Sequence, residues 1–280
     1  MLSIIICSRT KTLNTQLTQN IAHTIGCLHE LIVIDNSANK YSIFEAYNLG
    51  IQRSSGEFLC FVHEDVLFHT EGWGIVIQRI FNLNQEYGLL GVAGSSHKTR
   101  TPSGWWDCKD KYKSINIIQH YPNGKSVKEQ YGFENSVLNE VVFVDGVFLA
   151  LRKKIDIVFD EKLKGFHNYD FNISIETRKK QYKIGVTNQI ELEHFSVGNL
   201  NNEWIKSIIE VHKYYRNFLP MHIGSSTDAD AEVFSIKRLI NYLLAFGGSK
   251  KTLFKYCFKL FLMEPLSKSN INLFKKVLKT

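Results

Sequence analysis

The chain has 280 residues, of which 44% are hydrophobic and 22% charged, a composition typical of one large globular domain with or without an appendage. Its net charge of +7 comes from one end, since residues 250–280 hold eight of the 34 basic residues and one of the 27 acidic residues. The first 249 residues carry 26 of each sign, so the charge balance argues against a nucleic-acid-binding protein.

Cysteine usage and hydropathy indicate the compartment. The five cysteines are scattered and form no C-x-x-C pair, which predicts reduced thiols and a cytoplasmic protein. The first residues lack the basic and apolar regions of a secretory signal peptide. No segment reaches the roughly 18 to 20 apolar residues that a membrane-spanning helix needs.

Strands and helices alternate in the first third of the sequence. Continuous apolar runs predict buried strands, and apolar residues at helical spacing predict the helices between them. The predicted strands are 2–7, 30–35 and 56–62, and the predicted helices are 13–25 and 42–54. Within the second helix, Gly50 predicts close packing of helix against sheet. This alternation is typical of parallel strands joined by right-handed crossovers.

The remaining elements are less regular. We predict a helix at 71–86, a strand at 89–95, irregular strands and loops over 104–133, a strand at 140–153 that Asp145-Gly146 interrupts, and a strand within 183–198. Beyond residue 200 the pattern becomes helical, with a linker at 223–230. We therefore expect one α/β domain over residues 1–200 and a helical extension over 201–280.

Polar residues follow each of the first three predicted strands. In parallel sheets the carboxyl ends of the strands line up at one edge, where such sheets bind ligands. The polar residues at these three strand ends are Ser8, Arg9, Asp35, Asn36, His63, Glu64 and Asp65. We expect these side chains to lie close together.

The order of the segments resembles the GT-A glycosyltransferases of the family 2 type over residues 2–200. The resemblance is carried by SIIICSR, LIVIDNS, YNLGIQRSSGEFLCFVHEDV, FVDGVFLALRK and FHNYDFNISIETRKKQYKIGVTNQIELEHFSVG. It implies a Rossmann-like, mostly parallel central sheet flanked by helices, here with a helical C-terminal extension. The implied activity is inverting transfer of a sugar from a nucleotide-diphosphate donor, with UDP as the expected nucleotide, to an acceptor hydroxyl, usually with a divalent cation.

The resemblance implies a metal site at Asp65, which ends the segment similar to the family's D-x-D motif. Carboxylate oxygen suits Mg²⁺ or Mn²⁺ bound to a diphosphate. His63 stands where many relatives have the first aspartate, and imidazole suits Mn²⁺ better than Mg²⁺, so dependence on metal stays open. His194 resembles the histidine that completes the site in many relatives. The alternatives are a solvated strand end or a helix N-cap for Asp65 and a buried structural role for His194.

Donor-binding residues are implied at the same strand ends. Asp35, with Asn36 beside it, corresponds to the acid that accepts hydrogen bonds from the base or ribose. Ser8 and Arg9 would line the base and pyrophosphate. Glu64 is expected to turn from the metal and bind the scaffold or the sugar. The alternatives are an Asp-Asn turn without a ligand and a surface arginine.

Asp170 matches the family position of the catalytic base, which takes the proton of the acceptor hydroxyl. The alternative is an N-cap for the helix that follows, and one residue can serve both roles. Asp145-Gly146 suggests close backbone approach to the sugar or acceptor. Trp105 and Trp106 either stack on sugar faces or are partly buried aromatic residues.

The basic tail has two interpretations. Lys251, Lys255 and Lys259 recur at four-residue steps, and apolar residues such as Phe254 and Phe258 cover much of the rest. This composition is typical of a helix lying on an anionic membrane surface. The alternative is a helix packed on the enzyme or on a twin subunit in a homodimer, with its lysines in solvent.

Membrane contact would suit a saccharide or lipid-linked acceptor, as in the assembly of bacterial surface polysaccharides, at the inner face of the cytoplasmic membrane. That role follows from the resemblance and not from particular residues. The competing function is a non-catalytic nucleotide- or sugar-binding relative, in which the altered His63-Glu64-Asp65 segment no longer supports turnover.

Overall fold

Two sheets form the centre of the protein. The structure is a computed structural model and describes residues 1–198, 200–224, 228–265 and 267–279. Within these residues the larger sheet has seven strands in the order β10-β13-β5-β12-β3-β1-β2. Its strands are β1 (Leu2–Ser8), β2 (His29–Asp35), β3 (Phe58–Val62), β5 (Tyr87–Gly91), β10 (Leu138–Val141), β12 (Phe148–Arg152) and β13 (Lys183–Thr187). The expected α/β fold is confirmed.

The N-terminal half of this sheet is parallel. β1 lies between β2 and β3 and is parallel to both, with Ile4 opposite Leu31 on one side and Cys60 on the other. β12 is antiparallel to β3 and β5, and β10 is antiparallel to β13. The carboxyl ends of β1, β2 and β3 therefore lie at one edge, as the β-α alternation predicts.

Helices cover both faces of the larger sheet. Ile4 of β1 packs in one apolar cluster with residues of α1 (Thr15–Thr24) and α3 (Trp73–Leu83), whereas Ile5 packs in the other with residues of α2 (Ile43–Arg53) and α4 (Tyr169–Lys179). Burial on both faces explains why β1 and β3 are continuously apolar. β2 was predicted to be buried in the same way, but it is the edge strand of the sheet and only its Ile34 is buried. A Cβ atom on Gly50 of α2 would lie 2.3 Å from Cγ2 of Ile5, which confirms close packing of this helix on the sheet.

The second sheet departs from the sequence prediction. It has six strands among the described residues, in the order β11-β6-β8-β14-β4, with β9 paired to β8. Its strands are β4 (Val66–Phe68), β6 (Ala93–Ser95), β8 (Lys113–His120), β9 (Ser126–Tyr131), β11 (Phe143–Val144) and β14 (Leu192–His194). The region 104–133 was expected to hold irregular strands and loops, and within it β8 and β9 form a regular hairpin. β9 is mostly exposed and polar, so it lacks the apolar run that marks a buried strand.

Two predicted strands are divided between the sheets. The segment 89–95 contributes β5 to the larger sheet and β6 to the second sheet, and the segment 140–153 forms β10, β11 and β12. A third, two-stranded sheet pairs β7 (His97–Lys98) with β15 (Met221–His222). The predicted interruption at Asp145-Gly146 lies between β11 and β12. Periodicity cannot detect the other two divisions, because the residues on both sides of each break are buried.

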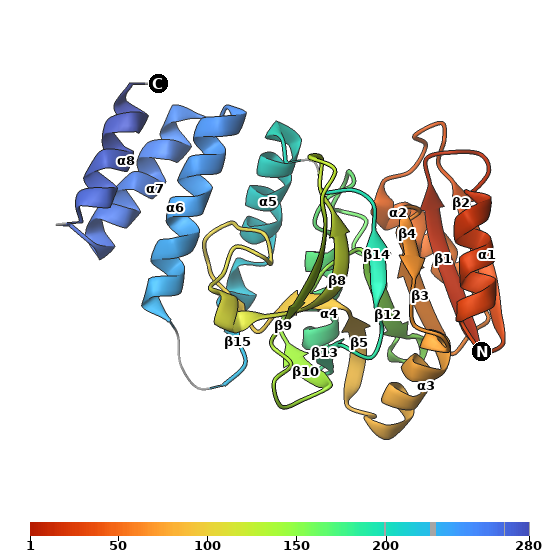
Figure 1. The fold of residues 1–280 in the computed structure, drawn as a ribbon. Coiled ribbons are helices and arrows are strands. Elements are labelled where there is room, and N and C mark those ends of the chain that lie inside the picture. Colours follow the sequence, from red (N-terminus) through yellow and green to blue (C-terminus); the bar gives the residue numbers. More distant parts are fainter. Residues whose placement is uncertain (199, 225–227, 266, 280) are drawn as a thin grey trace.

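The C-terminal helices are α5 (Asn202–Tyr214), α6 (Ala229–Phe246), α7 (Lys250–Met263) and α8 (Lys268–Leu278). Figure 1 shows α6, α7 and α8 side by side at the end of the molecule opposite β1, β2 and α1. The predicted linker 223–230 lies partly outside the described residues, and Asp228 already caps α6. Trp204 of α5 and Ile240 of α6 belong to the same apolar cluster as residues of the larger sheet. None of the described helices has the length and apolar character needed to cross a membrane.

Candidate active site

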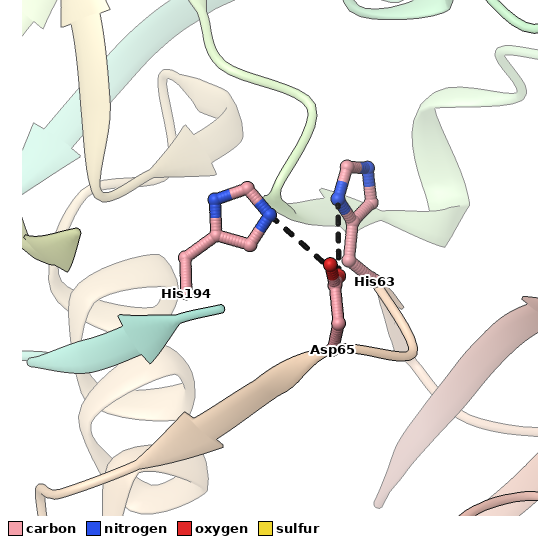
Figure 2. Close-up of side chains that lie close together, drawn as sticks. All are labelled: His63, Asp65 and His194. Carbon is pink, nitrogen blue, oxygen red and sulfur yellow. Dashed lines mark ion pairs between the residues drawn. The ribbon is translucent and has the colours of Figure 1, made fainter. Parts of the chain in front are cut away.

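Three predicted metal ligands come together where the two sheets meet. His63 follows the last residue of β3, and Asp65 directly precedes β4. β14 pairs antiparallel with β4 and sets His194 opposite Val66, beside Asp65. Figure 2 shows the two imidazole rings on either side of the Asp65 carboxylate. Strand pairing thus joins residues that are about 130 positions apart in the chain.

The geometry of this cluster suits a divalent cation. Asp65 Oδ1 lies 3.8 Å from His63 Nδ1 and 3.6 Å from His194 Nε2. One possible ligand atom from each of the three residues lies within 4.8 Å of the others. Two imidazole nitrogens and one carboxylate oxygen are donors that Mn²⁺ accepts more readily than Mg²⁺ does. The three residues therefore fit the expected metal, with Mn²⁺ favoured over Mg²⁺.

Gln119 of β8 sets the tautomer of His194. Its side-chain Nε2 donates to the carbonyl oxygens of His120 at 2.8 Å and Ser196 at 2.7 Å, which identifies the opposite atom as the amide oxygen. That oxygen lies 3.1 Å from His194 Nδ1, so Nδ1 carries the proton. The other nitrogen, Nε2, is buried without a hydrogen-bond partner among the described residues and faces Asp65. Support of this kind orients histidine ligands in metal sites.

Tyr169 sets the tautomer of His63 in the same way. The Tyr169 hydroxyl donates to the carbonyl oxygen of Gly146 at 3.1 Å, so it accepts a hydrogen bond from His63 Nε2 at 2.5 Å. Nδ1 of His63 therefore presents its lone pair to Asp65. Burial and the nearby His194 lower the pKa of His63, which keeps the ring neutral. Both histidines are thus arranged as ligands.

The sequence predicted that the sugar or acceptor approaches the backbone at Asp145-Gly146, but the side chain of Tyr169 occupies that place. A Cβ atom on Gly146 would lie 2.3 Å from the Tyr169 hydroxyl, so the space beside this glycine is filled by the tyrosine that holds His63. Sequence reasoning missed Tyr169 and Gln119. Tyr169 stands next to the predicted base, which is the one signal that could have found it.

We expect Tyr169→Phe to weaken Mn²⁺ binding by roughly 10- to 100-fold, the usual cost of losing the partner of a histidine ligand. The change leaves Nε2–H of His63 without its acceptor and frees the ring to turn. Calorimetric titration of the protein with Mn²⁺ measures the effect. Tyr214→Phe, which removes a hydroxyl bonded to Asp160 at 2.5 Å, should bind Mn²⁺ as the wild type does. Equal affinities for both variants would contradict the role of Tyr169.

Glu64 points away from this cluster toward the end of β1. Its Oε2 accepts hydrogen bonds from Ser8 Oγ at 2.9 Å and from the backbone N–H of Arg9 at 3.1 Å, and its Oε1 lies 2.6 Å from Arg9 Nε. The Arg9 side chain is 79% exposed even so. The carboxylate therefore orients a largely exposed guanidinium at the edge where the strands end.

Asp35 and Asn36 lie at the end of β2 and differ in their surroundings. Asp35 is exposed, and its Oδ1 accepts a hydrogen bond from the backbone N–H of Ser37 at 2.9 Å. Asn36 is buried, and its amide exchanges two hydrogen bonds with the backbone of Tyr41, both at 2.9 Å. Asn36 thus holds the loop, while Asp35 stands at the surface.

Asp170 is the second residue of α4, whose N-cap is Asn168, so Asp170 does not cap the helix. Its Oδ1 accepts a hydrogen bond from the N–H of Phe171 at 2.8 Å. Desolvation by the surrounding protein and then the negative charge of Asp145 raise the pKa of Asp170 to about 7, although hydrogen bonding and the charge of Lys98 act in the opposite direction. A carboxylate with a pKa near neutrality is suited to general base catalysis.

Asp145 is held by a loop that the C-terminal extension fixes. The indole N–H of Trp105 donates to Asp145 Oδ2 at 2.5 Å. Asp107 of the same loop accepts hydrogen bonds from Arg238 Nε at 2.9 Å and from the Tyr242 hydroxyl at 3.0 Å, both on α6. The extension thus reaches the site through Trp105, for which sequence reasoning offered only sugar stacking or partial burial.

Comparison with known proteins agrees with this arrangement. The model of a family described as glycosyltransferase-like matches residues 3–217. No curated protein sequence matches the chain. One similar solved structure is GalNAc-T7 with UDP, GalNAc and Mn²⁺, at a TM-score of 0.51 and 9% identity, covering 96% of this chain and 57% of that one. Another is TarS of S. aureus, at a TM-score of 0.50 and 11% identity, covering 97% of this chain and 50% of that one.

The two kinds of match carry different weight. The chain spans only about half the length of these two structures, and at such low identity the likeness shows the fold alone. The family match is independent of that likeness and extends over most of the chain, including every residue of the cluster. The chain therefore belongs to the glycosyltransferase-like family and has the fold of the GT-A glycosyltransferases.

Proposed function

We propose that this protein is an inverting glycosyltransferase that moves a sugar from a UDP-linked donor to an acceptor hydroxyl. The observation that carries the proposal is the cluster of His63, Asp65 and His194, in which both imidazole lone pairs face one carboxylate. The similar structure of GalNAc-T7 holds UDP, GalNAc and Mn²⁺, which supports the same class of donor and cation here.

Residues on two sides of the cluster would bind the donor. His63, Asp65 and His194 would hold the divalent cation, which when bound would offset the negative charge of the donor diphosphate. Arg9, oriented by Glu64, would contact the diphosphate from the end of β1. Asp35, exposed at the end of β2, would accept hydrogen bonds from the ribose or base. Asn36 would act only through the loop it holds.

Asp170 would act as the general base. Its carboxylate would take the proton of the acceptor hydroxyl as the acceptor oxygen bonds to the anomeric carbon and the bond from that carbon to the diphosphate breaks. A single displacement of this kind inverts the configuration of the anomeric carbon. The same carboxylate would also stabilise the positive charge that develops on the sugar.

We expect sugar transfer to fall as the pH drops below about 7, because the base must be ionised and the pKa of Asp170 is about 7. Asp145→Asn removes a negative charge that raises this pKa, so the acidic limb of kcat/KM should move to lower pH. Comparing the pH profiles of the wild type and the variant measures the shift. An acidic limb that stays in place, or moves upward, would contradict the electrostatic coupling.

A panel of nucleotide sugars tests the function itself. The purified full chain is incubated with Mn²⁺ and each donor, and release of the nucleotide diphosphate is measured. We expect slow hydrolysis of one donor, a UDP-sugar, which would then serve in a search for acceptors among saccharides and lipid-linked saccharides of bacterial surface polysaccharides. Mn²⁺-dependent binding of UDP without turnover of any donor would instead support a non-catalytic binding protein.

A further inference from the structure

Large apolar side chains lie on the outward side of α7 and α8. Four of them follow one another on α7 at helical spacing, and Phe258, Phe261 and Leu262 among these are 64%, 54% and 66% exposed. The residues Phe254, Phe258, Phe261, Leu262, Phe274 and Leu278 are here called the α7–α8 surface. The rings of Phe254 and Phe274 meet edge to face at 6.3 Å, so the two helices contribute to one continuous patch.

This patch is separate from the packing face of the helices. Leu253, Cys257 and Leu260 of α7 are buried in the same apolar cluster as residues of α6, and Val277 of α8 is buried there too. A helix packed on a globular domain normally presents polar residues on its opposite face. Here the opposite face carries phenylalanine and leucine. Exposed apolar patches of this kind mark surfaces that bind a partner or a membrane.

Positive charge borders the patch. Lys251 and Lys255 on α7 are exposed, as are three lysines of α8, at positions 268, 275 and 276, and Lys279 directly after it. Glu264, the one acid among residues 250–280, forms an ion pair with Lys237 of α6 at 3.1 Å. Lys259, the third lysine at four-residue spacing, forms an ion pair with Glu232 of α6 at 2.6 Å, so its charge is offset within the protein.

We propose that the α7–α8 surface binds an anionic lipid bilayer, with its apolar side chains entering the boundary of the acyl chains and the lysines contacting lipid phosphates. An apolar stripe bordered by lysines is the composition of helices that lie in such a surface. The charge argues against a second copy of the chain as the occupant. A twofold symmetric contact through this patch would bring the lysines of both copies together.

Vesicle flotation of the full chain tests the proposal. We expect binding to vesicles of phosphatidylcholine mixed with phosphatidylglycerol, little binding to phosphatidylcholine alone, and weaker binding as salt is raised. The double variant Lys251→Gln/Lys255→Gln should bind roughly 25-fold more weakly, at about fivefold for each lysine. Phe258→Glu/Leu262→Glu should abolish flotation, because both side chains are already exposed and would carry charge into the boundary.

Matched controls separate the patch from general effects of charge and apolarity. Leu83→Glu changes a leucine that is 77% exposed at the end of α3, and Lys162→Gln/Lys213→Gln removes two exposed lysines away from α7 and α8. Both controls should float as the wild type does, and thermal melting checks that every variant is folded.

Two results would overturn the proposal. The first is wild-type protein that fails to float with the mixed vesicles, or floats no better than Phe258→Glu/Leu262→Glu. The second is a concentration-dependent dimer, measured by sedimentation, that Phe258→Glu/Leu262→Glu abolishes while vesicles remain unbound, which would assign the surface to self-association. Since no sugar transfer is measured, failure here leaves the proposed function standing, and failure of that function leaves this result unaffected.

Discussion

Asp170→Asn is expected to lower kcat for sugar transfer by roughly 10²- to 10⁴-fold, the usual contribution of a positioned general base. Asparagine has nearly the same size as aspartate but cannot accept the proton of the acceptor hydroxyl. Mn²⁺-dependent binding of UDP should stay unchanged, because Asp170 lies outside the cluster of His63, Asp65 and His194. Transfer kinetics and calorimetry on the same protein preparation measure both quantities.

Stability distinguishes loss of the base from loss of the fold. The pKa of Asp170 is raised from its ordinary value of 3.8 to about 7 in the folded protein, so this carboxyl lowers the free energy of unfolding as the pH rises between these two values, and the full loss persists above pH 7. Asp170→Asn should therefore melt at the same or a higher temperature than the wild type at pH 8. Asp110→Asn, which changes a carboxyl that is 88% exposed, serves as the control for transfer. Wild-type turnover by Asp170→Asn would disprove the base assignment.

Asp65→Ala is expected to abolish the part of UDP binding that depends on Mn²⁺. It removes the carboxylate that both imidazole lone pairs face, and the remaining imidazole nitrogens leave the cation without a negatively charged ligand in the cluster. The loss should exceed the roughly 10- to 100-fold that removal of a supporting partner costs. Calorimetric titrations of UDP with and without Mn²⁺ measure it.

The adjacent carboxylate provides the matched control. Glu64 is the next residue in the chain, but its side chain binds Ser8 and Arg9. Glu64→Gln should therefore retain the affinity of the protein for Mn²⁺ alone. If Asp65→Ala bound UDP with the same dependence on Mn²⁺ as the wild type, the metal assignment would be wrong.

Much of the fold could be predicted because its signals are local. The strands β1, β2 and β3 each contain an apolar run, and α2 carries apolar residues at helical spacing, so each was predicted to within about two residues. The prediction was incomplete for β8 and β9, for which only irregular strands were expected and neither bounds nor pairing were given. A hairpin whose outer strand is polar and exposed has no apolar run for a sequence pattern to detect.

For the candidate site, too, residues with a local signal in the sequence could be predicted, whereas their partners in the folded protein could not. The strand ends and the family resemblance named His63, Asp65, His194 and Asp170 as candidates. The groups that orient these residues or shift their pKa come from elsewhere in the chain. Gln119 sets the tautomer of His194, and Trp105 contacts Asp145, whose charge raises the pKa of Asp170. No periodicity relates the loop of Trp105 and Asp107 to α6, because the hydrogen bonds of Asp107 to Arg238 and Tyr242 exist only in the folded protein.

The sequence by itself determined the β-α order, the shared edge at the carboxyl ends of β1, β2 and β3, and the basic, apolar composition of the tail. Only the tertiary structure decided that Glu64 faces Arg9, that both histidines offer a lone pair to Asp65, and that Lys259 turns inward to Glu232. The physical reason is that composition and spacing determine which faces of a helix or strand are apolar and which are charged. Which partner each face meets depends on packing between segments far apart in the chain.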